Sequence, residues 1–301
     1  MTPRDQPTAQ VGYDPGVNGS WFREFLACPD CGRDLSPGPE PPVCACGFAA
    51  KDDAPSDLRP QRAAHRNLAM PVQPRIELGN VVVDRPERLY TGPAAQRDSS
   101  ELFSAASPWL KSGAALLDLG CGPRDQFAPA QHYGLCYAGI DYSSPAADLL
   151  GDAHAIPFRA GTFDAVLSYA VFEHLHNPYL AAAEVARVLR PGGIFFGVVS
   201  QGEPYHESYF HHTTLGVLAI LGCAGLAPVR LWPSYDTLHA LAVMGRYPKP
   251  QRLLIELVYR FGRVFPILAP RKFFRWPERE KKIDELHRAA GIAFVAEKVP
   301  R

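Results

Sequence analysis

Four of the seven cysteines lie close together in the stretch CPDCGRDLSPGPEPPVCACG, at Cys28, Cys31, Cys44 and Cys46. Two cysteine pairs joined by a short Pro/Gly loop have the spacing of a structural zinc site, in which thiolates bind the ion tetrahedrally. The second pair has one intervening residue instead of two, so Cys44 is the ligand that is hardest to fit to a tetrahedron. The stretch predicts a zinc module, and the alternative is a similar module that folds without metal.

A second group of residues that could bind a ligand lies in the turn of LLDLGCGP, where Asp118 precedes Gly120 and Gly122. A dinucleotide site has a third glycine three residues further on, and this sequence has none at that position. A carboxylate beside the turn would also repel a pyrophosphate. It would attract a cation, and S-adenosylmethionine (SAM) carries an ammonium and a sulfonium but no phosphate.

Two further carboxylates support an adenosine ligand. Asp141 follows the next apolar run about 20 residues after the glycines, where a carboxylate accepts hydrogen bonds from ribose hydroxyls. Asp152 follows the third run, where it would accept a hydrogen bond from the adenine amino group.

The elements that position these residues alternate between strands and helices from Ala114 onwards, which predicts an α/β fold with a mostly parallel, doubly wound sheet of seven strands. Strands are expected at 114–120, 136–141, 147–153, 163–170, 194–200, 228–234 and 291–299. Helices are expected at 101–112, 178–190 and 212–225. Asp141 and Asp152 stand too close in sequence for a crossover helix, so that helix must be missing or reduced to one turn.

The motifs LLDLGCGP, AGIDYS, GDAHAIPF, FDAVLSYAVFEHL and LRPGG occur in the order found in class I SAM-dependent methyltransferases, and the sequence resembles that family, in the subgroup of the ubiquinone-pathway enzymes. The resemblance covers residues 100–200 well and 200–245 loosely. It implies a Rossmann-like fold and SAM as cofactor. The implied cofactor-binding residues are Asp118, Gly120, Cys121, Gly122, Asp141, Tyr142, Asp152, Ala153, Ser168 and Tyr169. The alternative is a protein of this fold that has lost activity.

The cysteine stretch resembles small zinc-binding modules that precede the catalytic domain of some bacterial methyltransferases. We therefore expect three regions: an N-terminal segment with the zinc module at 1–58, a connector at 59–100, and the methyltransferase domain at 101–301. Within that domain, residues 246–290 are expected to form a helical insertion before the last strand.

Candidate bases lie in two loops that leave the carboxyl edge of the predicted sheet, where ligands of open α/β folds bind. The pair Glu173 and His174 is common to relatives with unlike acceptors and is interpreted as framework or cofactor wall. The stretch GEPYHESYFHHTT is more specific to this chain than that pair, and we predict His206 or His211 as the general base. A purely structural role for either histidine is the alternative, and no catalytic metal is predicted.

Charge balance and the distribution of apolar residues indicate which partners and which cell compartment to expect. Lys+Arg and Asp+Glu both number 31, and acidic residues outnumber basic ones in residues 1–60, which argues against nucleic acid as partner. An N-terminus without an apolar segment and a cysteine cluster typical of reducing compartments predict a cytoplasmic protein. No stretch is apolar for long enough to span a membrane.

The leading functional hypothesis is methylation of oxygen or nitrogen in a small-molecule or glycan-type metabolite. The alternatives are an rRNA or tRNA methyltransferase and a non-catalytic partner protein. Residues 251–276 combine an apolar stripe with basic residues, which predicts either a lid packed on the sheet or peripheral contact with an anionic membrane. The sequence leaves the oligomeric state open.

Overall fold

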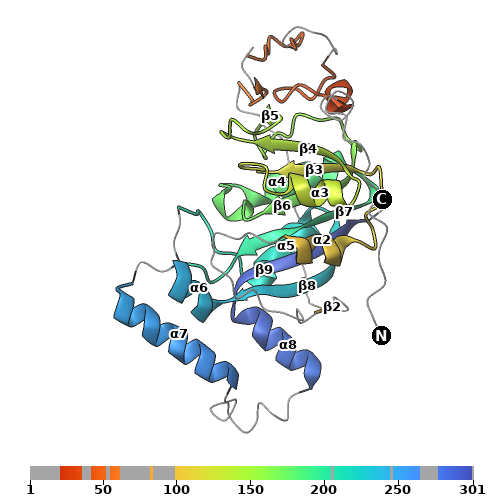
Figure 1. The fold of residues 1–301 in the computed structure, drawn as a ribbon. Coiled ribbons are helices and arrows are strands. Elements are labelled where there is room, and N and C mark those ends of the chain that lie inside the picture. Colours follow the sequence, from red (N-terminus) through yellow and green to blue (C-terminus); the bar gives the residue numbers. More distant parts are fainter. Residues whose placement is uncertain are drawn as a thin grey trace.

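A computed structural model of the 301-residue chain describes residues 21–35, 42–51, 55–61, 82–83, 99–204, 207–244, 247–264 and 277–299. These residues form one continuous sheet with helices on both faces (Figure 1). No helix among them is long and apolar enough to cross a membrane.

The sheet has nine strands within the described ranges, in the order β1-β5-β4-β3-β6-β7-β9-β8-β2. The strands are β1 (Ser56–Asp57), β2 (Val82–Val83), β3 (Ala115–Leu119), β4 (Cys136–Asp141), β5 (Leu149–Leu150), β6 (Phe163–Tyr169), β7 (Leu189–Ser200), β8 (Leu226–Asp236) and β9 (Ala289–Lys298). Only β9 runs antiparallel to its neighbours, β7 and β8. The α/β class, the mostly parallel sheet and the seven predicted strands are confirmed. The edge strands β1 and β2 were not predicted, because two residues carry no periodicity.

Alternating side chains of the sheet enter two apolar layers. Leu117 and Val166 belong to the layer that contains residues of α4 (Pro178–Val188) and α5 (Thr214–Cys223). Leu116 and Ala165 belong to the opposite layer, with α2 (Ser100–Ala106). A helix α3 (Phe127–His132) contributes its buried Ala130 to this second layer.

Local signals explain the helix ends. The Asn177 side chain accepts a hydrogen bond from Leu180 N at 3.1 Å, and Pro178 fills the first helical position of α4. Thr213 caps α5 in the same way, at 3.1 Å from Gly216 N. The helix predicted to reach Arg190 ends at Val188, because the chain enters β7 at Leu189 and continues in it through Pro-Gly-Gly.

The connection between β4 and β5 confirms the prediction that the crossover helix is missing, because residues 142–148 form turns and bends. The helical insertion begins earlier than predicted, with α6 (Thr237–Met244), and continues with α7 (Lys249–Val264) and α8 (Glu278–His287). Most of the predicted connector, and residues 265–276, lie outside the described residues.

The N-terminal segment shares its core with the sheet. Its described part begins with a 3-10 helix, η1 (Trp21–Phe25), whose Phe22 packs edge-on against Phe158 at 6.1 Å between ring centres. Trp21 Nε1 donates to Tyr137 O at 3.2 Å. Figure 1 shows this segment at the β5 edge, whereas α6, α7 and α8 lie at the opposite end of the molecule.

Candidate functional site

The turn after β3 requires two glycines for different reasons. Gly120 has φ +77°, and a Cβ there would collide with the Val171 side chain in the turn after β6. Gly122 has φ +51°, and a Cβ there would meet no atom within 4 Å. Gly120 is therefore needed for packing, whereas Gly122 faces open space.

Asp141 ties the end of β4 to this turn. Its Oδ2 accepts a hydrogen bond from Gly122 N at 3.0 Å, and its Oδ1 accepts from Ser143 N at 2.9 Å and Ser144 N at 2.8 Å. Two donors use the lone pairs of Oδ1, so Oδ2 is the atom with capacity left for a ribose hydroxyl. The carboxylate would thus both shape the turn and accept from the ligand.

Asp118 lies beneath the turn and is only 1% exposed. Tyr137 Oη donates to its Oδ2 at 2.7 Å. Burial raises the pKa of Asp118 to about 7, and the nearby Asp141 charge acts in the same direction. Burial, together with the charge of Asp118, also raises the pKa of the Cys121 thiol, which is buried here. Contact between Asp118 and a cation of the ligand stays a prediction.

Asp152 and Ala153 follow β5. Asp152 Oδ1 accepts from the backbone N of His154 at 2.9 Å and lies 2.6 Å from its Nδ1. Asn177 N donates to the other ring nitrogen, Nε2, at 3.3 Å. The two ring nitrogens thus face different partners, the Asp152 carboxylate at Nδ1 and the backbone of Asn177 at Nε2. Burial alone would raise the pKa of Asp152, but the bonds from His154 hold it below its ordinary value.

The loops after β5 and β6 also meet through two histidine rings, which are tilted by 34° to each other. The centres of His154 and His176 lie 4.1 Å apart. Together with the bond from Asn177, this contact holds in place the loop that carries Asp152 and Ala153. Contact between these two residues and adenine stays a prediction.

Ser168 and Tyr169 end β6 at the same edge. The Ser168 hydroxyl is buried and makes no hydrogen bond to the described residues. Ala170, the next residue, has φ +56°, an unusual conformation for a residue with a side chain. A buried hydroxyl beside a strained turn is the kind of group that a ligand satisfies, which fits the predicted position beside the sulfonium.

The loops that hold the predicted base are partly described. His206 lies outside the described residues, and His211 is exposed. Glu173, in the 3-10 helix η2 (Phe172–His174), is fully buried, and burial raises its pKa to about 8. Its carbonyl oxygen accepts from Tyr209 N at 2.8 Å, which agrees with its interpretation as framework.

His212 was not singled out from the sequence. It is buried among apolar side chains that include Phe172 and Val217, and burial lowers its pKa. These surroundings fit a packing role, and its neighbour His211 remains the predicted base.

The four predicted metal ligands come together. The sulfur atoms of Cys28, Cys31, Cys44 and Cys46 all lie within 4.8 Å of one another. Cys28 and Cys46 are 3.6 Å apart, as are Cys31 and Cys44. Tetrahedral zinc with bonds of about 2.3 Å separates its sulfurs by about 3.8 Å, so the set fits zinc and is too wide for disulfides. The short second knuckle does not prevent Cys44 from joining the set.

Arg59 is a site residue that sequence reasoning missed. Its Nη1 donates to Tyr142 O at 3.2 Å, and its guanidinium lies 5.1 Å from the centre of the Tyr142 ring. It follows the cysteines in a stretch without a motif, and its partner is far along the chain. No local signal could have found it.

The exposure of the apolar side chains on α7 disagrees with the lid hypothesis. A lid requires the apolar stripe to pack on the sheet, yet the described residues of the predicted stripe are 49–62% exposed: Leu254, Leu257, Val258 and Phe261. Arg252 instead bonds α7 to α6, from its Nε to Ala242 O at 2.8 Å. Among the described residues, the stripe faces away from the core.

Part of the sheet matches a known family model. Residues 117–197 match the family described as "Methyltransferase domain". A stretch of 139 residues is 34% identical to an uncharacterized 37.1 kDa protein in transposon TN4556 of Streptomyces fradiae, over 40% of this chain and 39% of that protein. An uncharacterized methyltransferase of Mycobacterium sp. (strain KMS) is 32% identical over 36% of this chain and 48% of that protein. The chain thus matches less than half the length of these relatives.

Solved structures with a similar fold include two of low sequence identity. The [4+2]-cyclase SpnF is 19% identical, with a TM-score of 0.45, over 68% of this chain and 83% of its own. A putative sarcosine dimethylglycine methyltransferase from Galdieria sulphuraria is 15% identical, with a TM-score of 0.47, over 68% and 87%.

Proposed function

We propose that this protein, whose residues 117–197 match the family described as "Methyltransferase domain", transfers a methyl group from SAM to oxygen or nitrogen of a small-molecule or glycan-type metabolite. The observation that carries the proposal is the bond between Asp141 Oδ2 and Gly122 N. It joins a carboxylate with spare acceptor capacity to a turn whose open side fits a ligand without a phosphate.

Bound SAM supplies a methyl group on a positively charged sulfur. The residues of the chain would hold the cofactor so that the acceptor approaches the methyl carbon in line. In that transfer the acceptor lone pair would form the new bond to the methyl carbon, and the electrons of the C–S bond would return to sulfur. An oxygen or nitrogen acceptor also loses a proton, for which His206 and His211 are our candidates.

The cysteine cluster supports a structural zinc ion in this proposal. Four thiolates close a tetrahedral site with no position left for substrate, so the ion would hold the module together. Methyl transfer would not pass through it.

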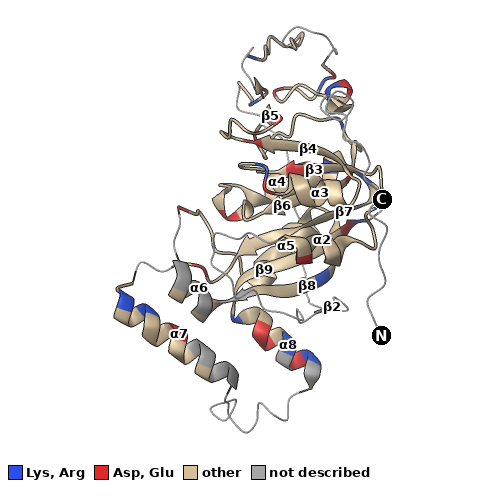
Figure 2. Ribbon diagram, in the orientation of Figure 1, with Lys and Arg blue, Asp and Glu red and all other residues tan. Residues whose placement is uncertain are grey.

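An exposed stripe on α7 supports peripheral contact with an anionic membrane. Residues 246–276 contain eight Lys/Arg and one Asp/Glu, and Figure 2 shows basic residues at the start of α7. An apolar face next to basic residues is typical of helices that lie on anionic lipid surfaces. The proposed acceptor would then be taken up near the membrane.

The test uses SAM labelled in its methyl group, incubated with the protein and a small-molecule extract or total RNA. We expect label in the small-molecule fraction and none in RNA. Label in RNA would favour the nucleic-acid alternative. Binding of S-adenosylhomocysteine without transfer to either fraction would favour the non-catalytic one.

A further inference from the structure

The edge strand β1 brings the N-terminal segment to the predicted cofactor site. Asp57 of β1 pairs with Leu150 of β5, and Leu150 pairs with Asp141 of β4. All three strands are parallel, so their carboxyl ends meet at one edge of the sheet. Arg59, two residues after β1, therefore emerges beside Asp141 and Tyr142.

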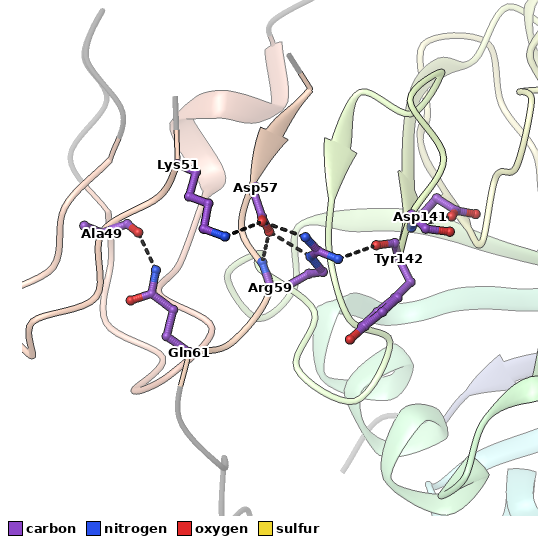
Figure 3. Close-up of polar contacts among 8 residues, drawn as sticks. Ala49, Lys51, Asp57, Arg59, Gln61, Asp141 and Tyr142 are labelled. Atoms are coloured by element: carbon purple, nitrogen blue, oxygen red, sulfur yellow. Dashed lines mark hydrogen bonds and ion pairs between the residues drawn. The ribbon is translucent and has the colours of Figure 1, made fainter. Parts of the chain in front are cut away.

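Arg59 is held in a defined orientation (Figure 3). Its Nε lies 2.9 Å from Asp57 Oδ1, and its Nη2 lies 2.8 Å from Asp57 Oδ2. The remaining terminal nitrogen donates to Tyr142 O, and the guanidinium covers one face of the Tyr142 ring. A two-point bond to a carboxylate fixes the plane of the guanidinium, and that plane in turn fixes the tyrosine.

The stretch that carries Arg59 is anchored to both cysteine knuckles. Gln61 N donates to Asp30 Oδ1 at 2.7 Å, and Asp30 lies between Cys28 and Cys31. Gln61 Nε2 donates to the carbonyl oxygen of Ala49, just beyond the second knuckle, at 2.5 Å. The position of Arg59 thus depends on the folded cysteine module.

Tyr142 has room to meet a ligand. Although Arg59 covers one face of its ring, the residue is 61% exposed. The following residues, 143–148, form turns where a crossover helix would otherwise support Tyr142. An aromatic ring supported from one side offers its other face for stacking with a flat base.

We propose that Arg59 is a positioning residue for the cofactor, which holds Tyr142 against the adenosine end in place of the missing crossover helix. The cysteine module would then form part of the cofactor site. This inference rests on the proposed function, because it assumes an adenosine ligand next to Asp141.

The test measures the affinity of the full-length protein for S-adenosylhomocysteine and for 5′-methylthioadenosine by calorimetry. We expect Arg59→Ala to weaken both by about tenfold, because cation–π and charge-assisted contacts are lost. Equal losses would place the effect at the adenosine end, which both ligands share. Tyr142→Ala should have a similar effect, and the double variant should lose no more than either single one.

Arg159→Ala is the matched control. It breaks an ion pair of 2.8 Å with Asp34 that also joins the module to the domain, but Arg159 precedes β6 and lies away from the carboxyl edge. We expect unchanged affinity. Additive losses in the double variant, or unchanged affinity in Arg59→Ala, would overturn the inference. No binding of either ligand to the wild-type protein would instead contradict the proposed function.

Discussion

Asp141 Oδ2 accepts a hydrogen bond from Gly122 N at 3.0 Å, so the end of β4 and the turn after β3 form a single unit. The same carboxylate accepts two more bonds from Ser143 and Ser144. Its removal would therefore release the turn as well as a ligand contact.

Replacing Asp141 by alanine should weaken binding of S-adenosylhomocysteine by roughly 10- to 150-fold, which corresponds to about 1.5–3 kcal/mol for a charged acceptor. Calorimetry measures the change. Asp284→Ala is the control, because it breaks an ion pair of 2.6 Å with Arg288 at the end of α8. Equal affinity in wild type and Asp141→Ala would remove Asp141 from the proposed site.

Zinc analysis tests the cysteine cluster. The purified protein should contain about one zinc per chain, and Cys31→Ser should lose it, since three thiolates bind zinc more weakly than four. Because Gln61 bonds both knuckles, the loss should also weaken S-adenosylhomocysteine binding. Cys223→Ser, a change outside the cluster, should retain the metal. Freshly reduced protein without zinc would contradict the assignment.

The buried carboxyl group of Asp118 should make stability depend on pH. Its folded pKa of about 7 exceeds its ordinary value of 3.8. Between these values the folded state holds a proton that the unfolded state lacks, so stability falls as pH rises and the contribution is lost above about 7. The slope is at most about 1.4 kcal/mol per pH unit.

Asp118→Asn should remove this slope, because an amide cannot ionise and still accepts a bond from Tyr137. Urea unfolding from pH 5 to 9 measures the effect. Glu173, whose pKa burial raises to about 8, should preserve a second slope in the variant. Identical pH profiles for wild type and Asp118→Asn would show that the carboxyl group ionises normally.

The stripe on α7 predicts binding to anionic vesicles. The protein should sediment with phosphatidylserine-containing vesicles at low salt and dissociate at high salt. Changing Leu254, Leu257 and Val258 to glutamine should weaken binding at least tenfold, since each buried leucine or valine contributes roughly 1.5–3 kcal/mol.

Leu238→Gln in α6 is the control for this series, because Leu238 is also exposed but does not belong to the stripe. It should leave vesicle binding unchanged. Equal sedimentation of wild type and the triple variant would exclude the stripe as the membrane contact.

The sequence predicted those parts of the molecule that depend on local patterns. Apolar runs located seven strands, and the distance between Asp141 and Asp152 revealed the missing helix. Cysteine spacing identified four sulfurs that the structure brings together.

Contacts between distant segments could not be predicted in this way. Arg59 meets Tyr142 only because β1 joins the sheet, and a strand of two residues has no periodicity. The lid hypothesis failed for the described part of α7 for a related reason. Amphipathicity shows that a helix has an apolar face, but does not show what that face contacts.

The position of β1 has a consequence for solubility. Without it, β5 would expose the backbone of Leu149 and Leu150 at the end of the sheet, and an unpaired apolar edge can pair with another chain and start aggregation. β1 occupies that edge, and Leu58 N continues the pairing with a bond to Leu150 O at 2.8 Å. A fragment that begins at residue 99 should therefore aggregate more readily than the full chain, even though it contains all of residues 117–197, which match the family model.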